Sequence, residues 1–164
     1  MPHRVYLGLG SNLGDRKANV REAEERLVEL ADTRIVKASS LYESEPHGNA
    51  KTWFVNNALE IETEFEPADL LKRTKAIETT MGRKRVKGKR WGSRIIDIDI
   101  LLFDNQTLNK RNLKIPHPEL QNRRFVLLPL SELAPDFTHP HVGLSVSELL
   151  GALKDTKKVT LMRP

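Results

Sequence analysis

Two aspartates stand two residues apart within a run of aliphatic residues, and their spacing indicates the chemistry that the chain could perform. Successive side chains of a β-strand point to opposite faces, so Asp97 and Asp99 share one face while the flanking isoleucines share the other. Adjacent carboxylates repel each other, whereas Mg²⁺ binds one or two carboxylates together with phosphate oxygens. The pair therefore indicates a site for a magnesium-bound phosphate compound. A solvent-exposed strand of alternating polarity is the alternative interpretation.

A basic segment, residues 83–94, directly precedes the aspartates. Six of its first eight residues are cationic and none is acidic: Arg83, Lys84, Arg85, Lys87, Lys89 and Arg90. The whole chain has 27 Lys and Arg against 22 Asp and Glu, a net charge of +5, so this segment alone accounts for the positive excess. Such local charge favours a small polyanionic ligand over a nucleic acid, and its cations suit phosphoryl transfer. Judged by charge alone, the segment could also be a solvated surface loop.

A glycine motif and a pair of histidines have simpler structural explanations. The glycines at positions 8, 10 and 14 do not fit the dinucleotide-binding pattern G-x-G-x-x-G, because the third comes one residue late. We therefore expect a tight turn between a strand and a helix there. His139 and His141 have no third metal ligand nearby in the sequence, so we expect both on the surface.

Hydrophobic periodicity predicts the elements that must position these residues. Strands are expected over Arg4–Leu9, Thr33–Tyr42, Phe54–Phe65 and Arg94–Phe103, and helices over Asp15–Ala31 and Pro67–Met81. The order β-α-β-β-α-β matches the ferredoxin-like motif, an α+β fold in which helices cover one face of an antiparallel sheet. A C-terminal extension follows, with expected helices at Asn122–Leu133 and Ser145–Leu153 and a last strand at Lys158–Met162.

Composition restricts the class of protein. The 164 residues, without a linker or repeat, predict a single domain over residues 1–164. With 38% hydrophobic and 30% charged residues, the chain has no tract as long as a membrane span, and its start lacks the apolar core of a signal peptide. The absence of cysteine excludes disulfides and thiolate metal sites. We expect a cytoplasmic protein without membrane or nucleic-acid partners.

The segment Arg90–Phe103, RWGSRIIDIDILLF, resembles the signature R-W-G-P-R-x-x-D-x-D-x-x-x-[FY] of the 6-hydroxymethyl-7,8-dihydropterin pyrophosphokinases. Supporting matches are Gly10–Leu13, Phe54–Asn56, Glu78 with Gly82–Arg83, Pro116–His117 and Asn122–Phe125. The resemblance covers nearly the whole chain. It implies an enzyme of folate biosynthesis that transfers pyrophosphate from ATP to a pterin alcohol and releases AMP, with ATP as co-substrate and two Mg²⁺ ions as cofactors.

The resemblance also implies roles for individual residues. The residues implied in catalysis are Arg83, Arg94, Asp97 and Asp99, of which the two aspartates hold the metal ions. The residues implied in pterin binding are Ser44, Phe54, Asn56 and Phe125. The residues implied in ATP binding are Lys75, Glu78, Arg83, Arg85, Trp91, Arg94, Ile100, His117 and Arg123. From the charge repulsion within Arg83–Trp91 we expect a lid that closes over the nucleotide, and we expect the enzyme to act as a monomer.

Three residues depart from the family pattern. Phe54 stands where many relatives carry Tyr, Lys75 where Gln is common, and Ser93 where the signature has Pro. Phe54 keeps a ring for stacking but lacks the hydroxyl.

Three functions of other classes would each have different requirements from a pyrophosphokinase. A nucleotidyltransferase would also use paired aspartates and Mg²⁺ but would attack the α-phosphorus and release diphosphate. A structural domain would bind no magnesium nucleotide. A ferredoxin-like RNA-binding module would need exposed aromatic residues on its central strands, and the sequence offers none in that pattern.

Overall fold

The computed structural model describes residues 1–46, 51–82 and 95–163. In this part of the chain, six strands form one antiparallel sheet and two short strands form a separate hairpin. The strands of the sheet are β1 (His3–Ser11), β2 (Thr33–Ala38), β3 (Tyr42–Ser44), β4 (Phe54–Thr63), β5 (Asp97–Phe103) and β8 (Val159–Leu161). The hairpin comprises β6 (Leu108–Lys110) and β7 (Leu113–Ile115). The helices are α1 (Arg16–Val28), α2 (Pro67–Gly82), α3 (Arg124–Leu133) and α4 (Val146–Gly151), and a single 3₁₀ turn covers Leu120–Asn122.

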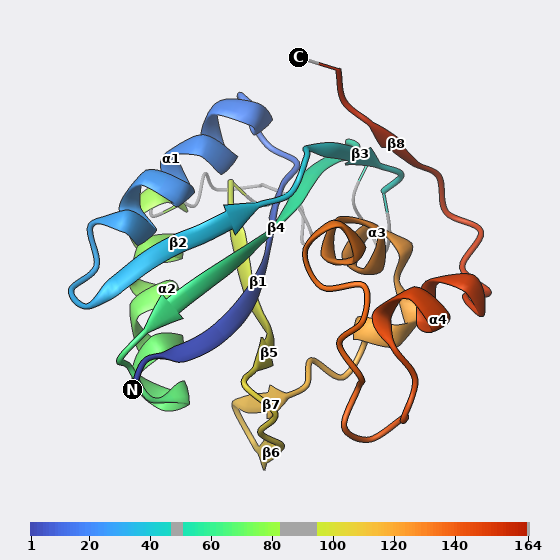
Figure 1. Cartoon of the computed structure of the whole chain (residues 1–164). Helices are drawn as coiled ribbons and strands as arrows, with labels where there is room; N and C mark the ends of the chain where they lie inside the picture. Colours follow the sequence, from blue (N-terminus) through green and yellow to red (C-terminus); the bar gives the residue numbers. More distant parts are fainter. Residues whose placement is uncertain (47–50, 83–94, 164) are drawn as a thin grey trace.

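The order of strands in the sheet is β5-β1-β4-β3-β8, and β2 pairs with β4 next to β3. Helix α1 joins β1 to β2 and helix α2 joins β4 to β5, and both lie on the same face of the sheet (Figure 1). This arrangement confirms the predicted α+β fold with a ferredoxin-like core.

The face covered by α1 and α2 carries the larger of two apolar clusters, which we call the helix-side core. Asp15 begins α1 by accepting a hydrogen bond from the backbone N–H of Ala18 at 3.1 Å. The helix then buries Val20, Ala23 and Leu27 at steps of three and four residues, as its periodicity predicts. These side chains pack against the odd-numbered residues of β1 and β4, namely Val5, Leu7, Leu9, Val55, Leu59 and Ile61.

The C-terminal extension packs on the opposite face of the sheet. There α3 lies against β4 and α4 lies beside α3 (Figure 1). The two core helices share one face, as predicted, and the extension adds helices on the other. A second apolar cluster joins Tyr6 of β1 and Leu102 of β5 to Leu127 and Leu130 of α3. This cluster covers only part of the face, and the candidate site lies beside it.

Two predictions made from glycine and histidine patterns are wrong. Strand β1 continues to Ser11, so Gly8 and Gly10 lie inside the strand, and only Gly14, with φ of 72°, lies in the turn before α1. His141 is exposed, as predicted, but His139 is only 4% exposed, and backbone N–H groups of His141 and Val142 both donate to its Nδ1.

The predicted strand Thr33–Tyr42 is two strands, β2 and β3. Ser39 separates them: its side-chain Oγ accepts the backbone N–H of Ala58 at 2.8 Å, in the place of a backbone carbonyl. The hairpin of β6 and β7 was not predicted. Each of its strands is only three residues long, which is too short for a recognisable alternation.

Candidate active site

A row of three residues crosses the sheet on the α3 side. Gly10 of β1 pairs with Asp97 of β5 on one side and with Asn56 of β4 on the other. Directly paired residues of antiparallel strands point to the same face. Because the middle residue has no side chain, the row has a carboxylate at one end, an amide at the other and a low floor between them. Gly8 likewise pairs with Asp99 and extends this floor by one step.

A pocket lies over this floor and contains about 510 Å³ of empty space, open solvent included. The lining residues are Gly8, Leu9, Gly10, Phe54, Asn56, Asn57, Asp97, Asp99, Leu101, Arg123, Phe125 and Val126. Asp97 and Asp99 share one face of β5, as their spacing predicts, and both line the pocket.

Asn56 is held in one orientation by Ser44. The Ser44 hydroxyl donates to Oδ1 of Asn56 at 2.5 Å, and both side chains are buried. The amide nitrogen of Asn56 consequently faces Gly10, where a Cβ atom would lie only 2.8 Å from it. Glycine at position 10 is therefore required for the amide to reach into the pocket.

Two aromatic residues line the pocket from different elements. Phe54 begins β4 on the sheet, and Phe125 lies in the first turn of α3. The guanidinium carbon of Arg123 lies 5.7 Å from the centroid of the Phe125 ring, a cation–π contact that places a positive group at the pocket wall. The pocket thus combines flat apolar rings with polar groups of both signs.

Glu78 of α2 fixes the start of β5. Its Oε2 accepts the backbone N–H of Ile98, between the two aspartates, at 2.8 Å, and its Oε1 lies 3.4 Å from Nζ of Lys75. Burial raises the pKa of the Glu78 carboxyl above its ordinary value, and the nearby Asp99 charge adds to this, while the hydrogen bond from Ile98 and the charge of Lys75 oppose it. Glu78 therefore anchors the strand that carries the aspartates.

His117 lies along the outer edge of β5. Its backbone N–H donates to the carbonyl of Leu101 at 2.9 Å, and its Nδ1 accepts the backbone N–H of Glu119 at 3.1 Å. Burial lowers the pKa of His117 below 6.5, opposed by the charge of Asp99 and reinforced by that of Arg123. The imidazole is therefore neutral at pH 7, and since Nδ1 accepts, Nε2 carries the proton and acts as a donor.

Asp97 and Asp99 are suitable ligands for Mg²⁺, which prefers oxygen donors. Within the described residues, no group of three or more His, Cys, Asp or Glu side chains is arranged to hold a metal ion. A complete protein cage is not needed, because magnesium in nucleotide sites takes one or two carboxylates and completes its coordination with phosphates and water. The carboxylate pair at the edge of the pocket fits such an ion.

The structure gathers most, but not all, of the predicted site residues that it describes. Phe54, Asn56, Asp97, Asp99, Arg123 and Phe125 line the pocket, and Ser44 contacts it through Asn56. Lys75 is 64% exposed and lies outside the pocket lining, paired with Glu78. The Ile100 side chain is 4% exposed and packs in the helix-side core, so any contact of Ile100 with a nucleotide would use its backbone. Arg83, Arg85, Trp91 and Arg94, and the expected lid Arg83–Trp91, lie outside the described residues.

Six lining residues were not among the predicted site residues: Gly8, Leu9, Gly10, Asn57, Leu101 and Val126. A signal for the glycines was present in the sequence, since Gly8 and Gly10 alternate with Leu7 and Leu9. Glycine inside a strand often marks the close approach of a ligand or another backbone.

The chain matches one family model and is similar to several known proteins. The model of the family described as 7,8-dihydro-6-hydroxymethylpterin-pyrophosphokinase (HPPK) matches residues 6–135. The 2-amino-4-hydroxy-6-hydroxymethyldihydropteridine pyrophosphokinase of Pseudomonas aeruginosa is 44% identical over 153 residues, which cover 93% of this chain and 93% of the relative. The protein of the same name from Haemophilus influenzae is 38% identical over 158 residues, which cover 96% of this chain and 97% of the relative.

Solved structures have the same fold. The crystal structure of HPPK-DHPS in complex with substrates superposes with a TM-score of 0.74 at 16% identity, over 92% of this chain and 43% of that chain. Wild-type HPPK-DHPS of Plasmodium falciparum with SDX-DHP gives a TM-score of 0.73 at 18% identity, over 93% of this chain and 44% of that chain. This chain thus spans less than half the length of those solved chains. Among the described residues, none of the helices combines the length and the hydropathy that a membrane crossing would need.

Proposed function

Because the chain belongs to the 7,8-dihydro-6-hydroxymethylpterin-pyrophosphokinase family, we propose that its pocket transfers the pyrophosphate of ATP to 6-hydroxymethyl-7,8-dihydropterin and releases AMP. The chain is a pyrophosphokinase that acts on this pterin alcohol in folate biosynthesis. The observation that supports the assignment of the site is the row of Asp97, Gly10 and Asn56. It places carboxylates at one end of a pocket and a fixed amide beside aromatic rings at the other.

The pterin binds at the end formed by Asn56, Phe54 and Phe125. A pterin is a flat ring with an amide-like edge, so it can stack on aromatic side chains while its edge pairs with an amide. Stacking contributes about 0.5–1.5 kcal/mol per aromatic pair beyond the area buried. Ser44 assists indirectly, because its hydrogen bond sets which atom of Asn56 faces the ring.

The triphosphate binds at the end formed by Asp97 and Asp99. Asp97 and Asp99 would hold magnesium, for which we propose two ions, and the metal would supply positive charge against the transferring group. The Arg123 guanidinium, at the pocket wall, contacts the phosphates as a further positive group. His117 donates from Nε2 to the nucleotide, and its neutral state avoids repulsion with Arg123.

The pocket accelerates the reaction by positioning. The hydroxymethyl oxygen of the pterin attacks the β-phosphorus and gives up its proton to water. The bond from that phosphorus to the oxygen bridging the α-phosphate breaks, and AMP leaves. No covalent intermediate with the protein forms. Holding the alcohol against the phosphorus converts a bimolecular encounter into a step within one complex, which is the main source of rate enhancement in phosphoryl transfer.

The remaining ATP-binding residues are assigned from the sequence resemblance. Arg83, Arg85, Trp91 and Arg94 belong to the basic segment and the signature, and we assign them to ATP on that basis. Lys75, Glu78 and Ile100 are assigned to ATP on the same resemblance. We also propose that the enzyme acts as a cytoplasmic monomer of one domain, 1–164.

The test is an assay of the purified chain with ATP, magnesium chloride and 6-hydroxymethyl-7,8-dihydropterin. We expect AMP and pterin diphosphate in equal amounts, and no product when EDTA removes the metal. Release of diphosphate instead of AMP would identify a nucleotidyltransferase. Failure to bind a magnesium nucleotide in calorimetry would identify a structural domain.

A further inference from the structure

The chain after α4 connects two elements next to the pocket: α3, which carries the lining residue Phe125, and β3, whose Ser44 orients the lining residue Asn56. This C-terminal segment, residues 155–162, lies beyond residue 135, where the match to the family model ends. It passes the first turn of α3, which carries Phe125, and then pairs with β3, which carries Ser44 (Figure 1).

At α3 the connection is made by Asp155. Its Oδ2 accepts the backbone N–H of Arg124 at 3.0 Å, and its Oδ1 accepts the backbone N–H of Lys157 at 3.0 Å. The guanidinium of Arg124 also donates to the carbonyl of Asp155 at 3.3 Å. The first N–H groups of a helix have no partner within the helix, and the N-cap residue of α3, Arg123, supplies no side-chain cap. Asp155 therefore caps α3 from 31 residues away, at the residue between Arg123 and Phe125.

At the sheet the connection is made by β8. Val159 pairs with Ser44, and the two backbones are joined further along by a bond from the N–H of Glu45 to the carbonyl of Lys158 at 2.9 Å. The Glu45 side chain returns the contact by accepting the N–H of Lys158 at 2.9 Å. Strand β8 thus stabilises the edge from which Ser44 orients Asn56.

We infer that Asp155 is a positioning residue for the pterin: it holds the Phe125 wall at a fixed place relative to the Asn56 wall, whose orientation Ser44 sets. Its carboxylate uses both oxygens on backbone N–H groups, one in α3 and one in the segment that leads to β8. Asp155 does not line the pocket, so it acts on the ligand only through these elements. This inference rests on the proposed function, because it names the pterin as the ligand of these walls.

The experiment compares three variants in the full chain. Asp155→Ala removes the cap of α3, and Asp155→Asn keeps one acceptor oxygen. Ser145→Ala is the matched control, because Ser145 caps α4 by accepting the N–H of Glu148 at 3.1 Å and does not line the pocket. The pterin dissociation constant is measured by calorimetry, kcat and KM by AMP release, and Tm by thermal unfolding.

We expect Asp155→Ala to raise the pterin dissociation constant and KM about fivefold, the equivalent of the ~1 kcal/mol that a lost cap costs, with kcat at saturating pterin little changed. Asp155→Asn should lie between Asp155→Ala and the wild type. Ser145→Ala should lower Tm by a similar amount and leave pterin binding unchanged.

A lower Tm with unchanged pterin affinity in Asp155→Ala would show that the residue is merely structural. If Asp155→Ala does not fold, the same comparison is made with Asp155→Asn, and unchanged affinity there would overturn the inference. Absence of AMP release by the wild type is a separate outcome, since it would contradict the proposed function itself.

Discussion

The environment of a pocket side chain depends on the residue paired with it on the neighbouring strand. Asp97 and Asp99 lie in line with Gly10 and Gly8, so no neighbouring side chain on β1 shields or pairs with them across that step. Two like charges on one face of a strand destabilise it by themselves. The magnesium site proposed above would compensate this repulsion.

Asp97→Asn and Asp99→Asn should each lower turnover by at least ~10²-fold, because each removes one negative ligand from the group that stabilises the transferring phosphate. Tm should not fall, since the change also removes a repulsion. AMP release at saturating magnesium and thermal unfolding measure the two effects. Asp136→Asn, at an exposed position outside the pocket lining, is the matched control. Near-normal turnover of either aspartate variant would rule out the metal site.

Gly10→Ala should weaken pterin binding about tenfold, because the new Cβ would lie 2.8 Å from Nδ2 of Asn56 and would displace the amide from its hydrogen bonds, a loss of about 1–3 kcal/mol. Gly8→Ala is a graded comparison. Its Cβ would meet Leu101 at 3.4 Å, an ordinary contact, so the effect should be smaller. Calorimetry with the pterin measures both, and equal losses would mean that Asn56 does not read the ring.

The sequence alone predicts that Asp97 and Asp99 share a face, but it does not predict the role of Gly10. Alternation within one strand places Asp97 and Asp99 on a common face without knowledge of any partner. The role of Gly10 depends on Asn56, which is paired with it across β4, and no local pattern reveals that register.

Among the elements, the break between β2 and β3 was the hardest to predict from the sequence. The periodic helices α1 and α2 and the long strands were predicted to within a few residues, because each buries one face continuously. The break between β2 and β3 depends on Glu132 of α3, whose Oε1 accepts the N–H of Ser40 at 3.0 Å and whose Oε2 accepts the hydroxyl of Tyr42. Contacts with a residue some 90 positions away leave no trace in the local sequence.

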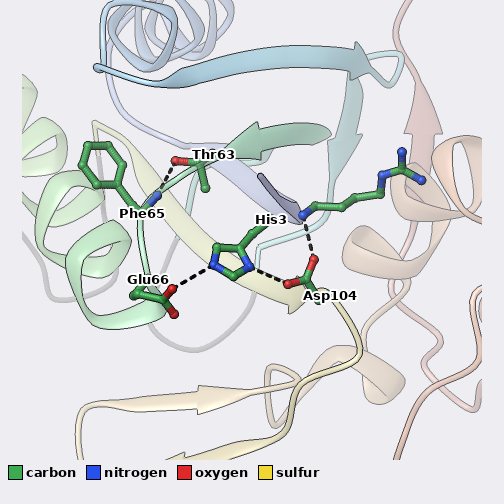
Figure 2. Close-up of polar contacts among 6 residues, drawn as sticks. His3, Thr63, Phe65, Glu66 and Asp104 are labelled. Carbon is green, nitrogen blue, oxygen red and sulfur yellow. Dashed lines mark hydrogen bonds and ion pairs between the residues drawn. The ribbon is translucent and has the colours of Figure 1, made fainter. Parts of the chain in front are cut away.

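Three elements meet at His3. Its Nδ1 lies 2.6 Å from Oδ2 of Asp104, just after β5, and its Nε2 lies 3.0 Å from Oε1 of Glu66, just before α2, as Figure 2 shows. Burial lowers the pKa of His3, but the hydrogen bonds and charges of the two carboxylates outweigh it, and the pKa is raised above 6.5. The protonated ring therefore bridges the start of β1 to both neighbours.

His3→Gln should lower Tm most at pH values below 6.5. A raised folded-state pKa gives a stabilisation that is complete below the unfolded value and is lost as the pH rises through the folded value. The Tm difference from the wild type should therefore shrink toward alkaline pH, in a series kept above about pH 5 so that the carboxylates stay ionised. His141→Gln, at an exposed histidine, controls for the loss of an imidazole. A difference that grows with pH would contradict the bridge.

At the scale of the described molecule, the six-stranded sheet has a different task on each face. The helix-side core contains buried aliphatic residues from α1, α2 and the sheet, and the opposite face carries the pocket together with α3 and α4. Packing on the first face should therefore determine stability, while packing on the second should determine both stability and binding.

Leu27→Ala in α1 and Leu127→Ala in α3 test this division, since both side chains are 0% exposed. Each should lower the free energy of unfolding by about 2–5 kcal/mol. Only Leu127→Ala should also raise the pterin KM, because its helix carries Phe125. Denaturant unfolding and steady-state kinetics measure the two quantities. An equal rise of KM in Leu27→Ala would mean that the two faces are coupled.

The register between β1 and β5 has one irregularity, since Leu102 pairs with Tyr6 and Ile100 with Leu7, so Leu101 is an extra residue. A one-residue slip during folding would exchange the faces of β5 and turn both aspartates into the helix-side core. A two-residue slip would keep the faces but move the extra residue into a stretch of regular ladder. Mispaired molecules would be compact and yet inactive, so the active fraction of a refolded sample measures how faithfully this one strand pairs.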